Sequence, residues 1–267
     1  MPQHINDVLQ LLLRWAHVIA GVIWIGHLYF FNWVNAHFAK LLDGPTKRVV
    51  VPELLPRALF WFRWGAAWTW ITGLLLGGLV YYHSKIVFED PMDPTNNPWL
   101  WLAIVIVIVM VGFVVYNLVM KKVANVLVAN TIVLLLFAAV YLFLESVGKF
   151  GGRSLYIHTG LILGSIMAGN VWMIIWPYQK KIIAAIKDGT APDAALVAQA
   201  TLRSRHNTYM SVPLLFTMIS NHYPTMYGNT QPLLGIAIRD WCLLGVFVLG
   251  FAAVRWMYGK SAKVSGL

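Results

Sequence analysis

The sequence predicts an all-α integral membrane protein, a polytopic helical bundle with about seven transmembrane helices in a single transmembrane domain, residues 1–267. Of its 267 residues, 59% are apolar and only 11% are charged, a composition typical of membrane proteins and not of soluble domains. Apolar runs of about 20 residues, long enough to cross a bilayer, recur along the chain. The 13 Trp and 11 Tyr suit the aromatic belts at the two membrane surfaces.

Seven apolar runs define the expected spans: Val8–Val34, Ala58–Tyr82, Trp99–Met120, Val123–Glu145, Leu155–Trp176, Asn207–Tyr223 and Leu233–Tyr258. The sixth is the shortest and contains Pro213, which neighbouring helices can accommodate in a membrane. Residues 35–57 and 178–206 are expected to be cytoplasmic loops with short amphipathic helices. The second loop should break at DGTAPD, where Gly189 and Pro192 interrupt the pattern.

Loop charge sets the expected orientation, because Lys and Arg accumulate on the cytoplasmic side. Fourteen basic residues fall in the first, third and fifth connections and the tail, against Lys85, Lys149 and Arg153 in the others. The N-terminus is therefore expected in the periplasm and the C-terminus in the cytoplasm of a multi-pass protein of the bacterial inner membrane. The net charge of +10 is assigned to these loops, so no nucleic-acid partner is expected.

Two stretches suggest a parallel internal repeat, spans 1–4 against spans 5–7. RWAHVIAGVIWIGHLYFFNWV starts at Arg14, and LYIHTGLILGSIMAGNVWMIIWP starts at Leu155. His17 aligns with His158, and His27 aligns with Asn170 when a two-residue gap is allowed. The alternative is that helices rich in Gly and Trp resemble each other by composition alone.

Histidines inside spans are the main candidates for function, because ionisable groups in a bilayer are costly. The topology places His17, His83, His158 and His222 in the outer half of the membrane, and His27 and His206 toward the cytoplasm. Neutral imidazole is a good axial ligand for haem iron. We therefore expect His17 and His158 to ligate a haem b, together or with His222 or His83.

Nearby residues extend the haem hypothesis. Arg14 lies three residues before His17 on the same helical face and is expected to pair with a propionate. His27 lies ten residues after His17, about 15 Å along the helix, so a second haem at His27 and His206 would make two haems at two depths. Small residues should leave room for the porphyrin: Gly21, Gly26, Gly160, Gly164 and Gly169. The alternative is that each histidine hydrogen-bonds a backbone carbonyl.

Other chemistries find no support in the sequence. Cys242 is the only cysteine, so there is no disulfide and no C-x-x-C-H attachment for a covalent haem. There is no P-loop, H-E-x-x-H or G-x-S-x-G. Catalytic residues are not indicated.

Four stretches resemble the N-terminal membrane domain of the bacterial membrane-bound urate oxidases that are fused to a cytochrome c. They are RWAHVIAGVIWIG, ELLPRALFWFRW with the following TWITG, the long segment IHTGLILGSIMAGNVWMIIWPYQKKIIAAIKDGTAPD, and RSRHNTYMSVPLLFTMISNHYP. The resemblance implies oxidation of urate to 5-hydroxyisourate, with electrons leaving through the cytochrome. The histidines that match are His17, His158, His206 and His222.

The chain also departs from that family. It ends after the seventh expected span, so a last span and the cytochrome are expected to be absent. Gly65 stands where the fused members carry Glu, and His27 stands where they carry a serine-type residue.

Three functions follow as hypotheses. The first is a haem b redox protein passing electrons between a small substrate or quinol and a separate c-type cytochrome or respiratory complex. The second is a complete urate oxidase that uses a cytochrome in trans. The third is a non-haem transporter or channel, whose histidines and arginines line a substrate path.

Overall fold

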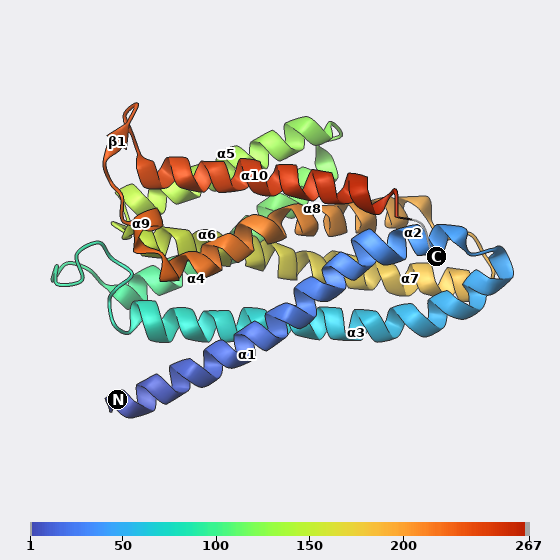
Figure 1. The fold of residues 1–267 in the computed structure, drawn as a ribbon, viewed down its shortest axis with the longest axis horizontal. Coiled ribbons are helices and arrows are strands. Elements are labelled where there is room, and N and C mark those ends of the chain that lie inside the picture. The colour runs from blue at the N-terminus through green and yellow to red at the C-terminus, as the bar shows by residue number, and fades with distance from the viewer. Residues whose placement is uncertain (1, 265–267) are drawn as a thin grey trace. The chain divides into compact units, whose positions relative to one another are not determined.

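The computed structural model describes residues 2–264, and helices account for most of them (Figure 1). The α-helices are α1 Gln3–Tyr29, α2 Ala36–Leu41, α3 Gly44–Leu76, α4 Pro98–Lys122, α5 Val126–Ser146, α6 Gly152–Gly169, α7 Trp176–Lys187, α8 Ala194–Ile219, α9 Pro224–Tyr227 and α10 Ile238–Ser261. Three π-helical segments, η1 Phe30–Asn35, η2 Gly77–Tyr82 and η3 Asn170–Ile175, and one 3₁₀ turn, η4 Ser220–His222, continue these helices. A two-residue antiparallel pair, β1 Pro232–Leu233 and β2 Ile236–Ala237, precedes α10.

Helices occupy all seven predicted spans, and five of them are long and apolar enough to cross a membrane. These five are Gln3–Leu41, Pro98–Lys122, Val126–Ser146, Gly152–Lys187 and Ile238–Ser261. The other two, α3 and α8, are helices of 33 and 26 residues with more polar side chains. The prediction of an all-α helical membrane protein is confirmed.

The chain divides into two compact units. Unit 1 comprises residues 1–10, 73–166 and 214–246, and unit 2 comprises residues 11–72, 167–213 and 247–267. The largest fully buried side chains of unit 1 include Tyr82, Phe150 and Tyr156, and those of unit 2 include Trp24, Phe62 and Arg203. A fully buried arginine is unusual and identifies a polar interior.

Helices α4 and α5 show why these residues fold locally as they do. Asn97 caps α4 by accepting the Leu100 amide at 3.1 Å, and Pro98 follows at the first turn, where its missing N–H costs nothing. Asn125 caps α5 by accepting two amide hydrogens. Asn97 thus fixes the start of α4, and Asn125 starts α5 shortly after α4 ends at Lys122.

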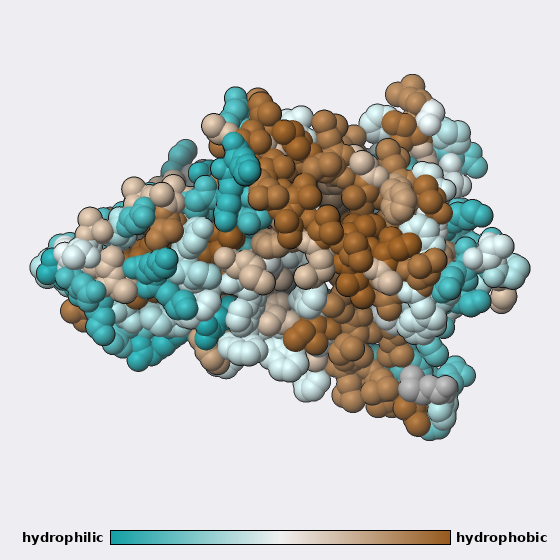
Figure 2. Space-filling view, turned by 180° about the vertical axis from the view of Figure 1, so that it is seen from behind, coloured by the Kyte–Doolittle hydropathy of each residue, from teal (hydrophilic) through white to brown (hydrophobic). Residues whose placement is uncertain are grey.

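Apolar side chains remain exposed on the outer faces of α4 and α5, and Figure 2 shows such side chains covering much of one face of the molecule. Exposed examples are Ile106, Val107, Met110, Val111 and Val114 on α4 and Leu127, Leu134, Leu135 and Leu142 on α5. Soluble proteins rarely expose so much contiguous apolar surface. Contact with lipid accounts for it.

Two spans share a backbone irregularity that supports the predicted repeat. The π-helical segment η1 begins at Phe30, 13 residues after His17, and η3 begins at Asn170, 12 residues after His158. Each interrupts an apolar helix and leads into a short α-helix, α2 or α7. Such π-bulges are rare and frequently occur at functional sites.

Contacts between loops agree with the sides predicted for them. In unit 2, Arg48 donates to the Gly189 carbonyl at 3.3 Å, and His37 bonds Ser261 at 3.3 Å, which joins the first loop to the fifth and to the tail. In unit 1, the Glu89 amide donates to the Lys149 carbonyl at 2.9 Å, which joins the second loop to the fourth. Which face of the membrane each set occupies stays a prediction.

The predicted loops are more helical than expected. Within 35–57, α3 already begins at Gly44 and continues through Pro52 and Pro56. Within 178–206, α7 and α8 are separated by residues 188–193, at the predicted DGTAPD break, where Gly189 has a φ of 73°. Each helix is continuous with a predicted span: α3 with the second, α7 with the fifth and α8 with the sixth. Nothing in the sequence stops these helices at the membrane surface.

Candidate functional site: histidines and polar side chains within the spans

His158 is the most deeply placed of the predicted ligands. It lies on α6 in unit 1 and is 2% exposed. Its Nδ1 lies 2.7 Å from the Ser154 carbonyl, and its Nε2 lies 2.7 Å from the Tyr82 hydroxyl. Because a carbonyl only accepts, Nδ1 carries the proton, and the Tyr82 hydroxyl donates to Nε2. Phe150 packs on the ring with centroids 4.8 Å apart.

A polar cluster lies beside His158 in the same unit. The Tyr81 hydroxyl donates to Asn221 Oδ1 at 2.6 Å, and Arg153 Nε donates to the same oxygen at 2.9 Å. The Arg153 guanidinium also lies 5.6 Å from the centre of the Tyr81 ring. These contacts bring η2, α6 and the start of η4 together, and neither YYH nor SNHYP in the sequence revealed this.

His83 and His222, the two alternative outer ligands, lie at the edges of this cluster. Each directly follows one of its members, Tyr82 or Asn221, and each is exposed. His17 belongs to unit 2. Iron ligation by His17 and His158 as a pair therefore remains a prediction.

His17 on α1 is held by α3. Its Nδ1 lies 3.0 Å from Thr72 Oγ1. The Thr72 hydroxyl directs its single proton to the Trp68 carbonyl at 2.6 Å, so toward His17 it acts as acceptor and Nδ1 is the donor. Arg14, the expected propionate partner, lies three residues earlier on α1 with an exposed side chain.

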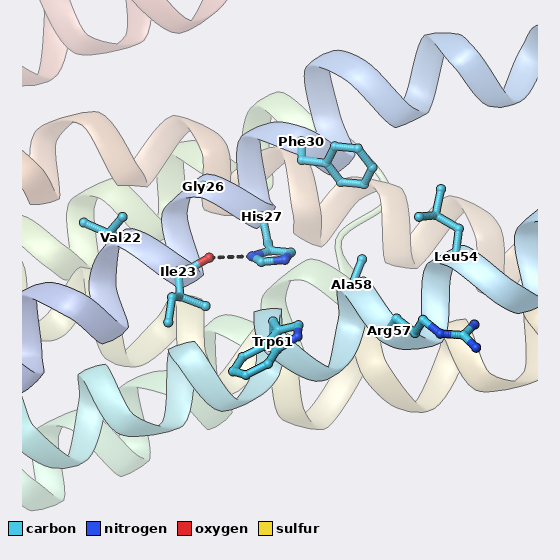
Figure 3. Close-up of a pocket in the computed structure, with 9 residues that line it drawn as sticks. All are labelled: Val22, Ile23, Gly26, His27, Phe30, Leu54, Arg57, Ala58 and Trp61. Atoms are coloured by element: carbon cyan, nitrogen blue, oxygen red, sulfur yellow. Dashed lines mark hydrogen bonds between the residues drawn. The ribbon is translucent and has the colours of Figure 1, made fainter.

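His27 has the same tautomer and lines a groove between α1 and α3. Its Nδ1 donates to the Ile23 carbonyl at 2.7 Å, which leaves the lone pair on Nε2. The groove has a volume of about 540 Å³. Figure 3 shows the His27 ring projecting from α1 toward Ala58 and Trp61 of α3. The other lining residues are Val22, Ile23, Gly26, Phe30, Leu54 and Arg57.

Close packing of α1 and α3 beside this groove depends on Gly65. A Cβ at that position would lie 2.9 Å from the Trp24 backbone nitrogen and 3.2 Å from the Ala20 carbonyl oxygen. No side chain fits there without separating the helices. This explains why a glycine is required at position 65 in this arrangement of α1 and α3.

The predicted small-residue space for a porphyrin is only partly present. A Cβ at Gly160 would lie 2.6 Å from Thr217 Oγ1, and one at Gly164 would lie 3.2 Å from Leu214. These two glycines therefore let α6 approach α8 closely. A Cβ at Gly26, in contrast, would meet nothing within 4 Å.

A buried polar face explains why α8 is less apolar than the other spans. In unit 2 this face carries Arg203, Asn207, Thr208 and Ser211, all 0% exposed. Positions four apart share a helical face, so 203, 207 and 211 form one stripe. His206, the predicted inner ligand, is half-buried between Arg203 and Asn207 on the same helix. It is not among the residues that line the His27 groove, which come from α1, the first residue of η1 and α3.

Both π-helical segments of the repeat direct a buried asparagine to α8. Asn32 of η1 donates to Ser204 Oγ at 2.8 Å, and its Oδ1 accepts from Tyr258 at 2.8 Å. Asn170 of η3 donates to Asn207 Oδ1 at 2.8 Å. The segments η1 and η3 thus bind neighbouring turns of one polar helix.

A charged cluster lies elsewhere in unit 1. Arg239 pairs with Glu145, and its Nε lies 3.7 Å from Asp240 Oδ1. The Tyr141 hydroxyl donates to the same Asp240 oxygen at 2.6 Å. One arginine of this cluster therefore faces two carboxylates, those of Glu145 and Asp240.

Within residues 2–264, no group of three or more His, Cys, Asp and Glu side chains is arranged to hold a metal ion. Haem iron takes only one or two protein ligands, so single histidines are the relevant donors. His17, His27 and His158 share the tautomer that metal-bound histidines usually have, in which Nδ1–H is donated to a fixed acceptor. The donor chemistry fits haem, although Tyr82 must turn away before His158 Nε2 could bind iron.

The comparison with known families decides the relationship. A family model described as "Urate oxidase N-terminal" matches residues 3–48 and 42–264. The chain belongs to the urate oxidase N-terminal family. Among curated proteins and solved structures nothing matches. The resemblance of its histidine-bearing spans to this family is therefore confirmed.

Membership gives the site residues a common setting. The two matched ranges include every histidine discussed above. They also include the π-helical segments η1 and η3 and the polar face of α8. In this member of the urate oxidase N-terminal family, the ionisable side chains described above lie around His158 and around Arg239 in unit 1, and at His17, in the α1–α3 groove and along α8 in unit 2.

Proposed function

We propose that this member of the urate oxidase N-terminal family is a redox protein of the bacterial inner membrane that binds haem b through histidines of its spans. It passes electrons between a small substrate or quinol and a separate c-type cytochrome or respiratory complex. The observation that carries the proposal is the shared tautomer of His17, His27 and His158. In each, Nδ1–H is donated to a fixed acceptor and the lone pair is on Nε2.

The protein's own residues would hold and orient the cofactor. Haem, when bound, supplies one-electron transfer. Thr72 fixes the ring of His17, and the Ser154 carbonyl fixes that of His158. Arg14 near His17 and Arg153 near His158 are the cations available for propionates. The Tyr82 hydroxyl occupies His158 Nε2 at 2.7 Å, so it must give up that hydrogen bond when His158 binds iron.

Urate is the substrate that the family name suggests. A complete urate oxidase that makes 5-hydroxyisourate and passes electrons to a cytochrome in trans is the more specific form of the proposal. Its support is the match over residues 3–48 and 42–264. Reduction of the haem band by added urate, without dithionite, separates this form from a protein that accepts electrons only from another donor.

Transport is a second candidate, favoured by the polar face of α8. Four polar side chains with 0% exposure in one unit of a membrane protein resemble the lining of a substrate path. A haem-free protein with substrate-dependent flux in proteoliposomes would support it.

An absorbance difference spectrum tests the haem proposal. The full chain is purified from cells supplied with haem, and the reduced-minus-oxidised spectrum is recorded for wild type, His17→Ala, His158→Ala and the control His4→Ala. The proposal expects a b-type α-band in wild type and control that is lost in the other two variants. A wild-type spectrum in both His17→Ala and His158→Ala would exclude ligation by this pair.

A further inference from the structure

The groove between α1 and α3 has an unusual composition for the surface of a membrane helix pair. Its walls are apolar apart from His27 and Arg57, and two aromatic rings, Phe30 and Trp61, line it. Gly26 borders its open space, since a Cβ there would meet nothing within 4 Å. A groove of about 540 Å³ is large enough for a substituted ring and the start of a hydrocarbon tail.

The nine lining residues come from α1, the first residue of η1 and α3, and seven of them are apolar, so the groove suits a ligand that reaches it from the bilayer. The Arg57 guanidinium pairs with Glu53, and both side chains are about 70% exposed. That ion pair marks the polar end of the groove. His27 lies away from it among apolar side chains, as Figure 3 shows.

His27 determines the chemistry that the groove can recognise. Its Nδ1–H is fixed on the Ile23 carbonyl at 2.7 Å, so the ring offers the groove a hydrogen-bond acceptor at Nε2. His27 is half-buried, and in a bilayer an acceptor that faces acyl chains has no donor there, which is costly. A hydroxyl on a flat ring satisfies His27 and packs against Phe30 and Trp61.

We propose that this groove binds the head group of a membrane quinol, with a ring hydroxyl donating to His27 Nε2 and the isoprenoid tail lying along α1 and α3. The choice of a redox-active ring over another lipid hydroxyl rests on the proposed redox function. The site assigns His27 to a lipid-soluble ligand.

Photolabelling tests the site directly. The full chain in lipid nanodiscs is illuminated with a hydroquinone that carries a ten-carbon tail and a diazirine beside the ring and is kept reduced with ascorbate, and labelled peptides are mapped by mass spectrometry. Wild type is expected to be labelled within residues 22–30 and 54–61. Decanoic acid, which has the tail without the ring, is expected not to compete.

Three variants make the test specific. Gly26→Leu fills the groove without a clash, and His27→Phe removes the acceptor while keeping a ring. Gly112→Leu on α4 is the matched control, since a Cβ there also meets nothing within 4 Å. Loss of one hydrogen bond or of the space should lower labelling about tenfold in the first two variants and leave the control unchanged.

Four results would each overturn the proposal. They are labelling outside the groove, labelling of Gly26→Leu and His27→Phe equal to that of wild type, displacement of the probe by decanoic acid, and no labelling of wild type. Haem content is measured on the same samples. Labelling by the probe in a protein without haem would contradict the proposed haem function but support the groove site. Haem in a protein that is not labelled would support the haem function but contradict the groove site.

Discussion

Replacing Gly65 by Ala should destabilise the protein, whereas the same change at Gly26 on the facing helix should not. A methyl group at Gly65 would lie 2.9 Å from the Trp24 backbone nitrogen and 3.2 Å from both the Ala20 carbonyl oxygen and Ile23 Cγ2. Favourable separations are about 3.5–4.0 Å. Helices α1 and α3 must therefore move apart locally by about half an ångström or more, because a backbone atom cannot rotate away.

The expected magnitude follows from two opposing terms. Overpacking of this kind costs about 1–3 kcal/mol, and replacing glycine by alanine inside a helix returns up to about 1 kcal/mol. Gly26→Ala receives the second term alone, since nothing lies within 4 Å of its Cβ. The helix-propensity term cancels between the variants, so Gly65→Ala should be less stable than Gly26→Ala by about 1–3 kcal/mol.

Equilibrium unfolding of both variants in mixed detergent micelles, followed by circular dichroism, measures this difference. Gly26→Ala serves as the matched control for helix propensity and expression. Equal stability of the two variants, or a more stable Gly65→Ala, would refute the close approach of α1 and α3 at Gly65.

Three further predictions address other parts of the chain. A reporter fused to the C-terminus should lie in the cytoplasm, and a reporter fused to the N-terminus should lie in the periplasm. The opposite result would contradict the orientation derived from loop charge. Asn207→Ala should destabilise by about 1–3 kcal/mol, because it removes two buried hydrogen bonds, one with the Asn170 amide and one with the Met167 carbonyl. Asn96→Ala in an exposed loop is the control, and equal stability would argue against the buried pair. Hydrogen bonds from Thr95, with the nearby Lys149, lower the pKa of Asp93. The turn that Asp93 forms is therefore fully stabilised above the ordinary Asp pKa and loses this contribution as the pH falls through the lowered pKa. Protection of the Thr95 amide from hydrogen exchange should fall over that pH range in wild type, and an equal fall in Asp93→Asn would exclude Asp93 as the cause.

The sequence predicted the helical architecture well because lipid imposes a simple rule on composition and length. Runs of about 20 apolar residues placed α4, α5 and α10 to within a few residues. It was less informative for α8, because several polar side chains of this helix are buried within the protein and do not face lipid. The stripe at 203, 207 and 211 was present in the sequence, but which face a helix buries depends on its neighbours.

The site was harder to predict than the fold. Depth along each span identified His17, His27 and His158 as candidates, but not their partners. Tyr82 and Thr72 come from distant segments, and only the fold brings them to His158 and His17. The glycines expected to make room for a porphyrin differ in role, because Gly160 faces Thr217 closely while Gly26 faces open space. A glycine therefore borders open space only where the side chains of the facing helix do not fill it.

The most direct test of the account is the amount of haem b per polypeptide in the purified full chain, measured as the pyridine haemochrome and compared with His17→Ala, His158→Ala and His27→Ala. The account predicts at least one haem per chain, lost in the His17 and His158 variants. If His27 and His206 hold a second haem, the ratio is near two and falls to one in His27→Ala; if His27 serves the quinol groove, the ratio is one and does not change. A purified, folded protein without haem would contradict the central claim.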